Sequence, residues 1–540
     1  MLRGKLYMPP RRLKIFTKIA TPKRKNNKLI THFWKEITFL LMLPEIVRAA
    51  AKNFEDKTAI ECENGISLSY KDLDRISDEV SGGLLKRGLM EGSIVLLSLP
   101  TSIEYLIIYI AASKIGVITA GVNPRFKALE RRAICEITEP DLVITTLDLS
   151  DGIPTDFSVE TIEITENSQK LLLDLRSDSF QPKELEENFD RAICVCFTSG
   201  STGIPKGALF TNKELLAIQK MDTEGVWGTG GHLVPSTAFA HVGSMTKLPW
   251  QLSKGLTLHI LDRWKAEKVL KLVETHRISA IAGVSAQISL LLKVENLENY
   301  DLGCVKAVVA GGGPSPPSLV IRAKENFNAP YSIRYSSTES GGIGLATSLE
   351  APLEESLYTI GKPRPGVQAK ILGEDGQLVE TGEIGELFLK TPSSMNSYWR
   401  DSKNTKKFLV DGWLKTEDLA REREAGLFSL AGRTNEMFIR GGYNVYPQEV
   451  ESVLSTHPKI EQMVLIPKPH HTLGETGVAF VVPSKPGESP TLKDLIEFGK
   501  DKLARYKLPE EVTVIDELPL KHGFKINRSF LKDLVSKENS

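Results

Sequence analysis

The chain has 540 residues, with 68 basic and 68 acidic side chains and a formal net charge of zero. Hydrophobic residues make up 41% and charged residues 25%, which excludes a disordered, collagen-like or disulfide-scaffold protein and allows more than one folded domain. The neutral balance also argues against a nucleic-acid partner for the chain as a whole.

The zero net charge hides an uneven distribution. Residues 1–40 hold eleven Lys or Arg and one acid, Glu36, so this extension carries +10 and residues 41–540 carry −10. The segment has no apolar stretch followed by a small-residue cleavage site, so a secretory signal is not expected. Three interpretations stay open: a mitochondrial targeting peptide, a start codon assigned too early, or a tail that contacts anionic lipid.

Cysteine and hydropathy patterns predict a cytoplasmic protein, with peripheral membrane contact through the basic N-terminus as an option. The longest apolar stretch, Tyr105 to Val122, is interrupted by Lys114, and a membrane-spanning helix needs about 18–20 apolar residues. The cysteines are scattered without metal-ligand spacing, which predicts reduced thiols. They are Cys62, Cys135, Cys194, Cys196 and Cys304.

From Leu43 onward, helix-length amphipathic stretches alternate with short apolar runs. Helices are expected over Pro44–Lys52, Tyr70–Arg87 and Ile103–Lys114. This alternation predicts an α/β fold with parallel-rich sheets that helices cover on both faces. The expected strands are Ser93–Leu99, Val117–Val122, Leu142–Thr146, Ala192–Phe197, Leu256–Leu261, Ala280–Val284 and Val305–Ala310.

After about residue 355 the pattern changes to dense glycine turns and alternating strands, which predicts a small antiparallel β unit and then an α+β block. The expected elements are strands Gln368–Leu372, Gly385–Leu389, Leu427–Leu430, Met463–Ile466 and Val478–Val482, a helix from Pro447, and a helix from Thr491 that carries Leu503. The domain prediction is a basic extension (1–40), a large N-terminal domain (41–432), a hinge (433–437) and a small mobile C-terminal domain (438–540).

The strongest local motif is TSGSTGIPKG, Thr198 to Gly207, directly after an apolar strand. Its glycines free backbone N–H groups to surround an anion, and its hydroxyls and Lys206 add donors and positive charge. The spacing is not that of a Walker A motif. A phosphate-binding loop is the favoured interpretation, and a flexible Ser/Gly linker is the alternative.

This motif resembles the phosphate loop of the adenylate-forming enzymes, which include acyl-CoA synthetases, peptide-synthetase adenylation domains and firefly luciferase. The resemblance covers about residues 43–530 and implies that ATP, Mg²⁺ and CoA are used. It implies phosphate contacts by Thr198, Ser199, Gly200, Ser201, Thr202, Gly203 and Lys206.

Three further segments match the family's nucleotide-binding motifs: AGGGP at 310–314, YSSTE at 335–339 and GWLKTEDL at 412–419. The resemblance implies that Thr338 meets the α-phosphate and that Glu339 holds Mg²⁺, for which a carboxylate oxygen is a suitable ligand. Without the resemblance, these stretches would be interpreted as turns and polar loops. The implied nucleotide contacts are Gly311, Gly312, Gly313, Tyr335, Asp418, which binds the ribose, and Arg433.

The remaining motifs concern the acyl group, CoA and the moving domain. His241 and Gly243, in AFAHVGS, match the acyl entrance, although a structural histidine is the alternative. Gly441 and Gly442 match the CoA approach. The resemblance also implies a hinge at Asn435 and a catalytic adenylation lysine at Lys525.

The sequence departs from the family pattern at five positions. Ala240 replaces the usual phenylalanine before His241, which predicts a wider pocket mouth. Glu417 and Phe524 replace glycine, Lys521 replaces threonine, and Asn435 replaces the usual Asp or Lys. The resulting prediction is an ATP-dependent acyl-CoA synthetase for a carboxylic acid, expected to be a medium- or long-chain fatty acid. Aryl and steroid side-chain acids, an acyl-AMP ligase that loads a carrier protein, and a nucleotide-binding homologue with weak ligase activity are the alternatives.

Overall fold

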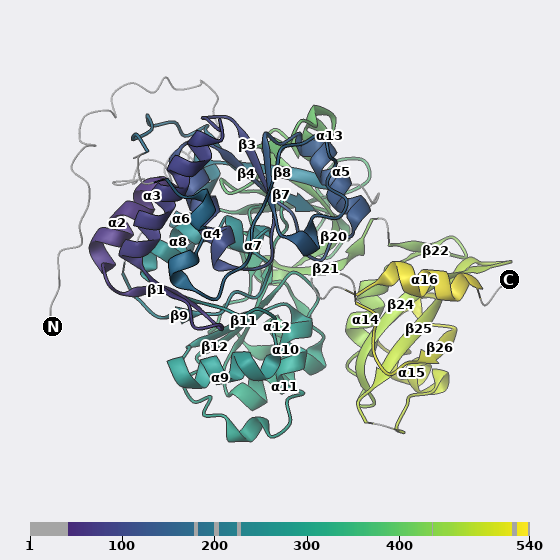
Figure 1. Ribbon diagram of the computed structural model, residues 1–540. Coiled ribbons are helices and arrows are strands. Elements are labelled where there is room, and N and C mark those ends of the chain that lie inside the picture. The colour runs from purple at the N-terminus through teal and green to yellow at the C-terminus, as the bar shows by residue number, and fades with distance from the viewer. Residues whose placement is uncertain are drawn as a thin grey trace. The chain divides into compact units, whose positions relative to one another are not determined.

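The computed structural model describes residues 41–177, 182–198, 205–223, 228–434, 436–485, 487–520 and 526–537. They form two compact units, each made of stretches that are discontinuous in the sequence (Figure 1). The first unit takes the described residues up to Trp264 together with Ser337–Ile343 and Thr391–Gly412. The second takes Lys265–Ser336, Gly344–Lys390 and the described residues from Trp413 onward.

The first unit is built on a seven-stranded sheet with the order β18-β8-β7-β4-β3-β5-β6. The strands from β7 to β6 in this order run parallel, whereas β8 runs antiparallel to β7, and β18 antiparallel to β8. The bounds are β3 (Ile94–Ser98), β4 (Ile118–Gly121), β5 (Leu142–Thr145), β6 (Val159–Thr161), β7 (Ala192–Thr198), β8 (Lys206–Thr211) and β18 (Ser397–Tyr398).

A four-stranded sheet, β2-β1-β10-β9, completes the β-structure of the first unit. Its strands are β1 (Thr58–Cys62), β2 (Ser67–Ser69), β9 (His232–Leu233) and β10 (Thr257–Ile260). The helices of the unit are α2 (Leu43–Phe54), α3 (Tyr70–Lys86), α4 (Ile103–Lys114), α5 (Ala128–Thr138), α6 (Asn212–Thr223), α7 (Val242–Met245), α8 (Leu248–Lys254) and α13 (Ser402–Phe408). Figure 1 shows α2, α3, α4, α6 and α8 as neighbours.

The second unit contains a five-stranded sheet, β11-β12-β13-β14-β15, and an antiparallel sheet in which β17 lies between β16 and β20, and β21 pairs with β20. Its strands are β11 (Ala280–Gly283), β12 (Ala307–Gly311), β13 (Tyr331–Tyr335), β14 (Leu345–Ala346), β15 (Lys362–Pro363), β16 (Gln368–Leu372), β17 (Gly385–Lys390), β20 (Trp413–Arg423) and β21 (Leu427–Arg433). Its helices before residue 400 are α9 (Ala266–His276), α10 (Ser285–Leu291), α11 (Pro317–Phe327) and α12 (Leu353–Tyr358).

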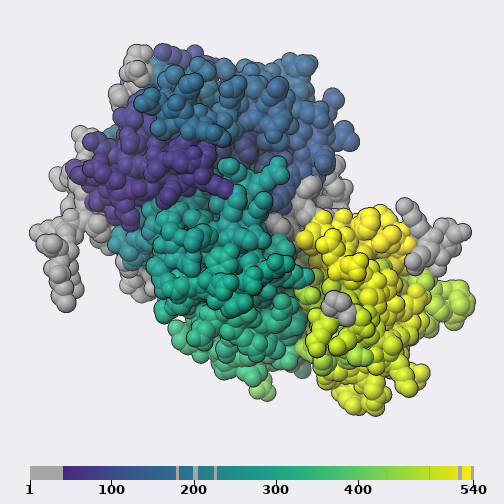
Figure 2. Space-filling model, turned by 60° about the horizontal axis from the view of Figure 1, so that its bottom comes forward, coloured from purple at the N-terminus to yellow at the C-terminus, as the bar shows by residue number. Residues whose placement is uncertain are grey.

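The C-terminal segment packs on itself around two apolar clusters and is seen as the yellow-green to yellow body in Figure 2. Its sheet has the order β23-β22-β25-β24, with β26 parallel to β25. The elements are β22 (Phe438–Arg440), β23 (Tyr443–Val445), α14 (Pro447–Leu454), β24 (Ile460–His470), β25 (Gly474–Pro483), α15 (Leu492–Gly499), β26 (Glu511–Val514) and α16 (Arg528–Lys537).

These elements confirm the α/β prediction, the antiparallel unit and the final α+β block. One expected helix is shorter than predicted: α15 ends at Gly499, and Leu503 lies beyond it, although Leu503 is still buried in the core. Gly499 packs too closely against Leu454 and Leu508 to carry a side chain, which explains a residue with low helix propensity at this point. Among the described residues, no helix is long and apolar enough to cross a membrane.

A buried lysine at the C-terminal end of α4 is paired with two carboxylates. Lys114 closes this fully buried helix, and its side chain is 0% exposed. Its Nζ atom lies 2.5 Å from the carboxylate of Asp74 and 2.8 Å from that of Asp78, both on α3. Arg48 of α2 also binds Asp78, so one ion-pair cluster joins three helices. Burial lowers the pKa of Lys114, and the two carboxylates oppose that effect.

We expect Lys114→Met to destabilise the first unit by about 3 kcal/mol, because Asp74 and Asp78 lose their buried partner while Arg48 remains. Urea unfolding followed by circular dichroism measures this loss. Lys86→Met, at an exposed position near the end of α3, is the matched control and should change stability by less than about 0.5 kcal/mol. Equal effects of the two substitutions would contradict the prediction.

Candidate functional site

The two ends of the predicted phosphate loop are held by strand pairing. Thr198 at the end of β7 faces Lys206 at the start of β8, and the Thr198 Oγ1 atom donates to the Lys206 carbonyl at 3.4 Å. Gly207 must be glycine, because a Cβ atom there would lie 2.6 Å from Val195 Cγ1. The predicted contacts Ser199, Gly200, Ser201, Thr202 and Gly203 lie outside the described residues.

The Lys206 ammonium group lies between two aromatic rings of the same unit. Its Nζ atom is 4.3 Å from the ring centre of Phe408 and 5.5 Å from that of Tyr398. The two rings meet edge to face at 5.8 Å. Cation–π attraction at these distances restrains a flexible side chain without neutralising its charge. The two rings therefore hold the Lys206 ammonium group beside the start of β8, at one end of the predicted phosphate loop.

Glu339, the predicted magnesium ligand, is oriented by the same tyrosine. The Tyr398 hydroxyl donates to Glu339 Oε1 at 2.8 Å, and the Glu339 carbonyl accepts the Met395 N–H at 2.7 Å. Thr338 precedes it in a turn closed by the Gly341 N–H, which donates to the Thr338 carbonyl at 3.0 Å. The structure thus connects Lys206 and Glu339 through Tyr398.

In the second unit, two predicted nucleotide contacts, Tyr335 and Arg433, bind a third, Asp418. Tyr335, at the end of β13, donates its hydroxyl to Asp418 Oδ2 at 2.6 Å. Arg433, at the end of β21, places Nε 2.9 Å from Asp418 Oδ1, because Asp418 and Arg433 are directly opposite in the β20–β21 ladder. A carboxylate with one donor on each oxygen is positioned for the two hydroxyl groups of a vicinal diol.

Burial dominates the electrostatics of this group. Asp418 is 9% exposed, and burial raises its pKa, with Arg433 and the Tyr335 hydroxyl acting in the opposite direction. The Arg433 side chain is 54% exposed, so solvent screens its attraction and burial prevails. The pKa of Tyr335 is raised as well, first by burial and then by the nearby Asp418 charge. Tyr335 therefore stays a neutral donor.

The glycine triplet lies at the same edge of the second unit's sheet as Tyr335. Strands β12 and β13 are parallel, with Gly311 opposite Arg334, so their carboxyl ends lie together. Gly311 has no room for a side chain, since a Cβ atom would lie 2.9 Å from the Arg334 carbonyl oxygen. Gly312 has φ +75°, while Gly313 faces open space. Close packing therefore explains glycine at Gly311, and positive φ explains it at Gly312.

Glu417 occupies a position where the backbone favours glycine. Its φ of 59° lies in the left-handed region, which costs about 1–2 kcal/mol for a residue with a Cβ atom. The Glu417 carbonyl accepts both the N–H and the Oγ1 hydroxyl of Thr434, at 3.1 and 3.3 Å. These bonds hold the turn that aims the next residue, Asp418.

The predicted acyl-entrance residues begin helix α7. His241 is the N-cap, and its Nδ1 atom accepts the Gly243 N–H at 3.2 Å. The neighbouring Phe239 is buried and meets Tyr105 of α4 at a ring distance of 5.9 Å. The residues on either side of His241 in the chain, Ala240 and Val242, are buried as well.

The remaining predicted residues lie in the C-terminal part. Gly441 and Gly442 form the turn between β22 and β23, with φ 58° and 88°, and both are exposed. The Gly441 N–H donates to the Leu473 carbonyl at 2.7 Å. Asn435 and Lys525 lie outside the described residues.

Tyr398 and Phe408 were not predicted from the sequence. No glycine motif marks the segment around them, and their role depends on β18 pairing with β8, where Tyr398 faces Ala208. To predict them from the sequence, one would have to expect the residues near 398 to pair with β8, the strand that follows the phosphate loop.

Two family models match the chain. The family model "AMP-binding enzyme" matches residues 47–399, and the model "AMP-binding enzyme C-terminal domain" matches residues 449–525. The chain belongs to the AMP-binding enzyme family. It is an acid–thiol ligase of the AMP-dependent acyl-CoA synthetase group, which activates an acid as an acyl-AMP.

Curated relatives match over most of their length. An indoleacetate–CoA ligase of Aromatoleum aromaticum is 27% identical, over 89% of this chain and 96% of its own. A fatty acid–[acyl-carrier-protein] ligase of Streptomyces coeruleorubidus is 28% identical (88% and 93%), and a medium-chain fatty-acid–CoA ligase of Escherichia coli is 26% identical (91% and 90%). The fold also matches ATP-bound MatB from Rhodopseudomonas palustris, with a TM-score of 0.82 and 24% identity over 93% of this chain and 100% of that one.

We expect Tyr398→Phe to keep the ring beside Lys206 but to lose the hydroxyl that orients Glu339. A hydrogen bond to a charged group is worth about 1.5–3 kcal/mol, so the KM for Mg·ATP in ATP–pyrophosphate exchange should rise at least about tenfold. Tyr358→Phe, at an exposed tyrosine of α12, is the matched control. An unchanged KM in Tyr398→Phe would show that this hydroxyl does not position Glu339 for catalysis.

Proposed function

We propose that this protein is an ATP-dependent acyl-CoA synthetase that converts a medium- or long-chain fatty acid to acyl-AMP and then to acyl-CoA, releasing pyrophosphate and AMP. The observation that carries the proposal is the Asp418 carboxylate with Tyr335 and Arg433 on its two oxygens, the three residues that the resemblance implies for the nucleoside. Lys206 and Glu339, joined through Tyr398, support it on the phosphate side.

In the first half-reaction, a carboxylate oxygen of the fatty acid attacks the α-phosphorus of ATP, the bond to the bridging β-phosphate oxygen breaks, and pyrophosphate leaves. Negative charge concentrates on the phosphates, so catalysis depends on positioning and on positive charge. Lys206 and the 198–207 loop supply donors to the phosphates. Thr338 and Lys525 act at the α-phosphate, and Asp418 holds the ribose.

The chemistry of Glu339 fits Mg²⁺, because it offers a hard carboxylate oxygen whose orientation the Tyr398 hydroxyl fixes. When bound there, Mg²⁺ would supply further neutralisation of phosphate charge. The Tyr398 hydroxyl donates to Glu339 Oε1 and so keeps this carboxylate oriented.

In the second half-reaction, the CoA thiol sulfur attacks the acyl carbon, the thiol proton is lost, and AMP leaves with the electrons of the acyl–oxygen bond. We propose that the small domain (438–540) rotates relative to the large domain (41–432) about Asn435, within the hinge 433–437. This motion withdraws Lys525 and presents Gly441 and Gly442 to CoA. Positive φ at these two glycines supports a close backbone approach.

An apolar acid is favoured by the surroundings of His241, where Phe239, Ala240 and Val242 are all buried. Aryl acids remain alternative substrates for this protein, because one relative is an indoleacetate–CoA ligase. A carrier protein remains the alternative acceptor, because another relative is a fatty acid–[acyl-carrier-protein] ligase. The basic segment 1–40 contains none of the proposed catalytic residues. Its net charge of +10 supports peripheral contact with anionic membrane as one proposed role, beside that of a targeting peptide.

ATP–pyrophosphate exchange with a panel of fatty and aryl acids tests the proposal. We expect exchange that requires a fatty acid, and acyl-CoA formation on addition of CoA. Lys525→Ala should lose adenylation at least about a hundredfold but still transfer a supplied acyl-AMP to CoA. Adenylate that passes only to a carrier protein would overturn the CoA assignment, and full adenylation by Lys525→Ala would overturn that of the lysine.

Burial of Asp418 makes nucleotide use pH-dependent. The ionised carboxylate accepts the ribose hydroxyls, and its raised pKa means that it is protonated at a higher pH than an ordinary aspartate. The value of kcat/KM for ATP should therefore fall on acidification with a midpoint above about 3.9.

Arg433→Met should move this midpoint to higher pH, because the arginine favours the charged form of Asp418. Asp418→Asn should lower kcat/KM and remove the transition. The same midpoint in Arg433→Met as in the natural protein would show that another group controls the profile.

A further inference from the structure

A row of titratable side chains crosses the four-stranded sheet of the first unit, away from the residues assigned to ATP. Glu61 of β1 lies directly opposite His259 of β10, and His232 of β9 lies opposite Thr257, two residues before His259. Residues two apart in a strand share a face, so Glu61, His259 and His232 lie side by side on one face of three parallel strands.

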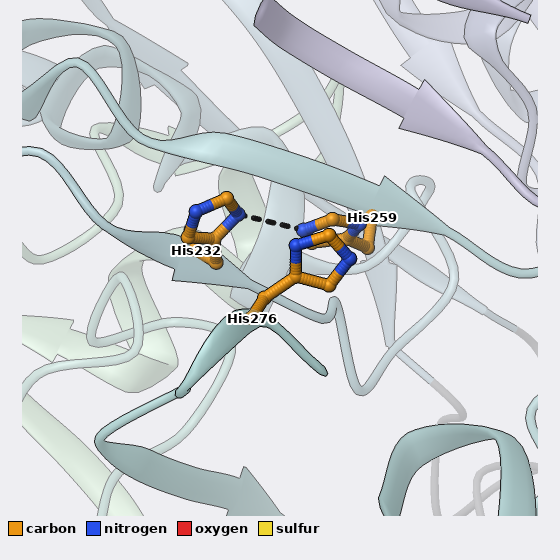
Figure 3. A group of neighbouring side chains, drawn as sticks. All are labelled: His232, His259 and His276. Carbon is orange, nitrogen blue, oxygen red and sulfur yellow. Dashed lines mark hydrogen bonds between the residues drawn. The ribbon is translucent and has the colours of Figure 1, made fainter. Parts of the chain in front are cut away.

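The two histidine rings are placed nitrogen to nitrogen. His232 Nδ1 and His259 Nε2 are 2.9 Å apart, and the rings are stacked with their centres 5.1 Å apart (Figure 3). His259 is 2% exposed, whereas the Glu61 side chain is 45% exposed. The third side chain labelled in Figure 3, His276, belongs to the second unit, in the last turn of α9.

Glu61 lies next to the other ring nitrogen of His259. The Glu61 Oε2 atom lies 3.6 Å from His259 Nδ1, a position from which the carboxylate favours a proton on that nitrogen. A histidine with one ring nitrogen near a carboxylate and the other directed at a second histidine has the arrangement that supports a metal-bound imidazole in proteins.

We propose that His232 Nδ1 and His259 Nε2 form a binding site for one divalent transition-metal ion, with water completing its coordination. Metal–nitrogen bonds of about 2.0–2.1 Å place two ligands at 90° about 2.9 Å apart and two tetrahedral ligands about 3.3 Å apart. The observed separation fits square-planar or octahedral coordination directly, and tetrahedral coordination after a shift of a few tenths of an ångström.

The ligand set also defines which ions bind. Imidazole suits Zn²⁺, Ni²⁺, Co²⁺ and Cu²⁺, whereas Mg²⁺ and Ca²⁺ require oxygen ligands. The site is therefore chemically distinct from the Mg²⁺ proposed at Glu339. Binding must displace the proton shared between the two nitrogens, so affinity should fall on acidification.

Titration of the full chain with Zn²⁺ and Co²⁺ tests the proposal by direct binding, independently of ligase activity. The protein is prepared without an affinity tag and stripped with chelator. His470 and His471 form a second stacked pair, of sequence neighbours, so the reference protein is the His470→Gln, His471→Gln double variant. Calorimetry should give one equivalent of Zn²⁺ that excess Mg²⁺ does not displace, and Co²⁺ should develop visible ligand-field bands.

In that reference protein, His259→Gln and His232→Gln should each remove the bound equivalent. Glu61→Gln should weaken binding about 10–100-fold, the usual cost of losing an outer carboxylate. His457→Gln, in the C-terminal segment, is the control and should bind as the reference does. Unchanged binding in His259→Gln or His232→Gln, or loss of all binding in the reference protein itself, would overturn the site.

A measurement on folded protein covers the case in which a histidine variant does not fold. Cu²⁺ bound to the reference protein should show couplings to imidazole nitrogens in pulsed electron paramagnetic resonance. Absence of these couplings would also overturn the proposal.

Discussion

The antiparallel return of β8 along β7 is the constraint on which the chemistry of the first unit depends. β7 is buried beside the parallel strand β4, and its pairing with β8 holds Thr198 opposite Lys206 at the two ends of the phosphate loop. β18 then pairs with β8 and places Tyr398 beside Lys206. One change of strand direction therefore brings together three groups that are distant in the sequence: the Lys206 ammonium group, the Tyr398 hydroxyl and the Glu339 carboxylate.

In the second unit, the cost of removing a carboxylate from water determines how the group around Asp418 is arranged. Removing the Asp418 carboxylate from water is unfavourable, and neither Tyr335 nor the half-exposed Arg433 cancels that cost, since the pKa remains raised. The same two partners keep both oxygens oriented. Each oxygen keeps a further lone pair that can accept a hydroxyl of a diol, so the group is organised before a ligand arrives and binding needs little rearrangement.

The sequence predicted what depends on local pattern and on recognisable motifs. The alternation of helices and apolar runs indicated the α/β fold, and the order of the motifs found Tyr335, Asp418 and Arg433 before their contacts were known. Tyr398 and Phe408 could not be found in this way, because their importance arises from the pairing of β18 with β8, a long-range contact. The sequence indicates Lys114 as the end of a helix and an interruption of an apolar stretch, but the cluster with Asp74 and Asp78 that makes it part of the core depends on how α3 and α4 pack. The histidine pair likewise depends on strand register, which no local pattern encodes.

Glu417 shows how a departure from a family pattern can be tolerated. The turn before Asp418 requires a left-handed residue, and glycine would adopt it without strain. Glu417 accepts the strain because its neighbours determine the path of the chain: the Thr416 hydroxyl donates to the Leu387 carbonyl and accepts the Asp418 N–H, while Thr434 donates twice to the Glu417 carbonyl. Each hydrogen bond contributes about 0.5–1.5 kcal/mol, so the set exceeds the cost of about 1–2 kcal/mol. The backbone that orients Asp418 is therefore maintained by its hydrogen bonds rather than by the identity of the residue at 417.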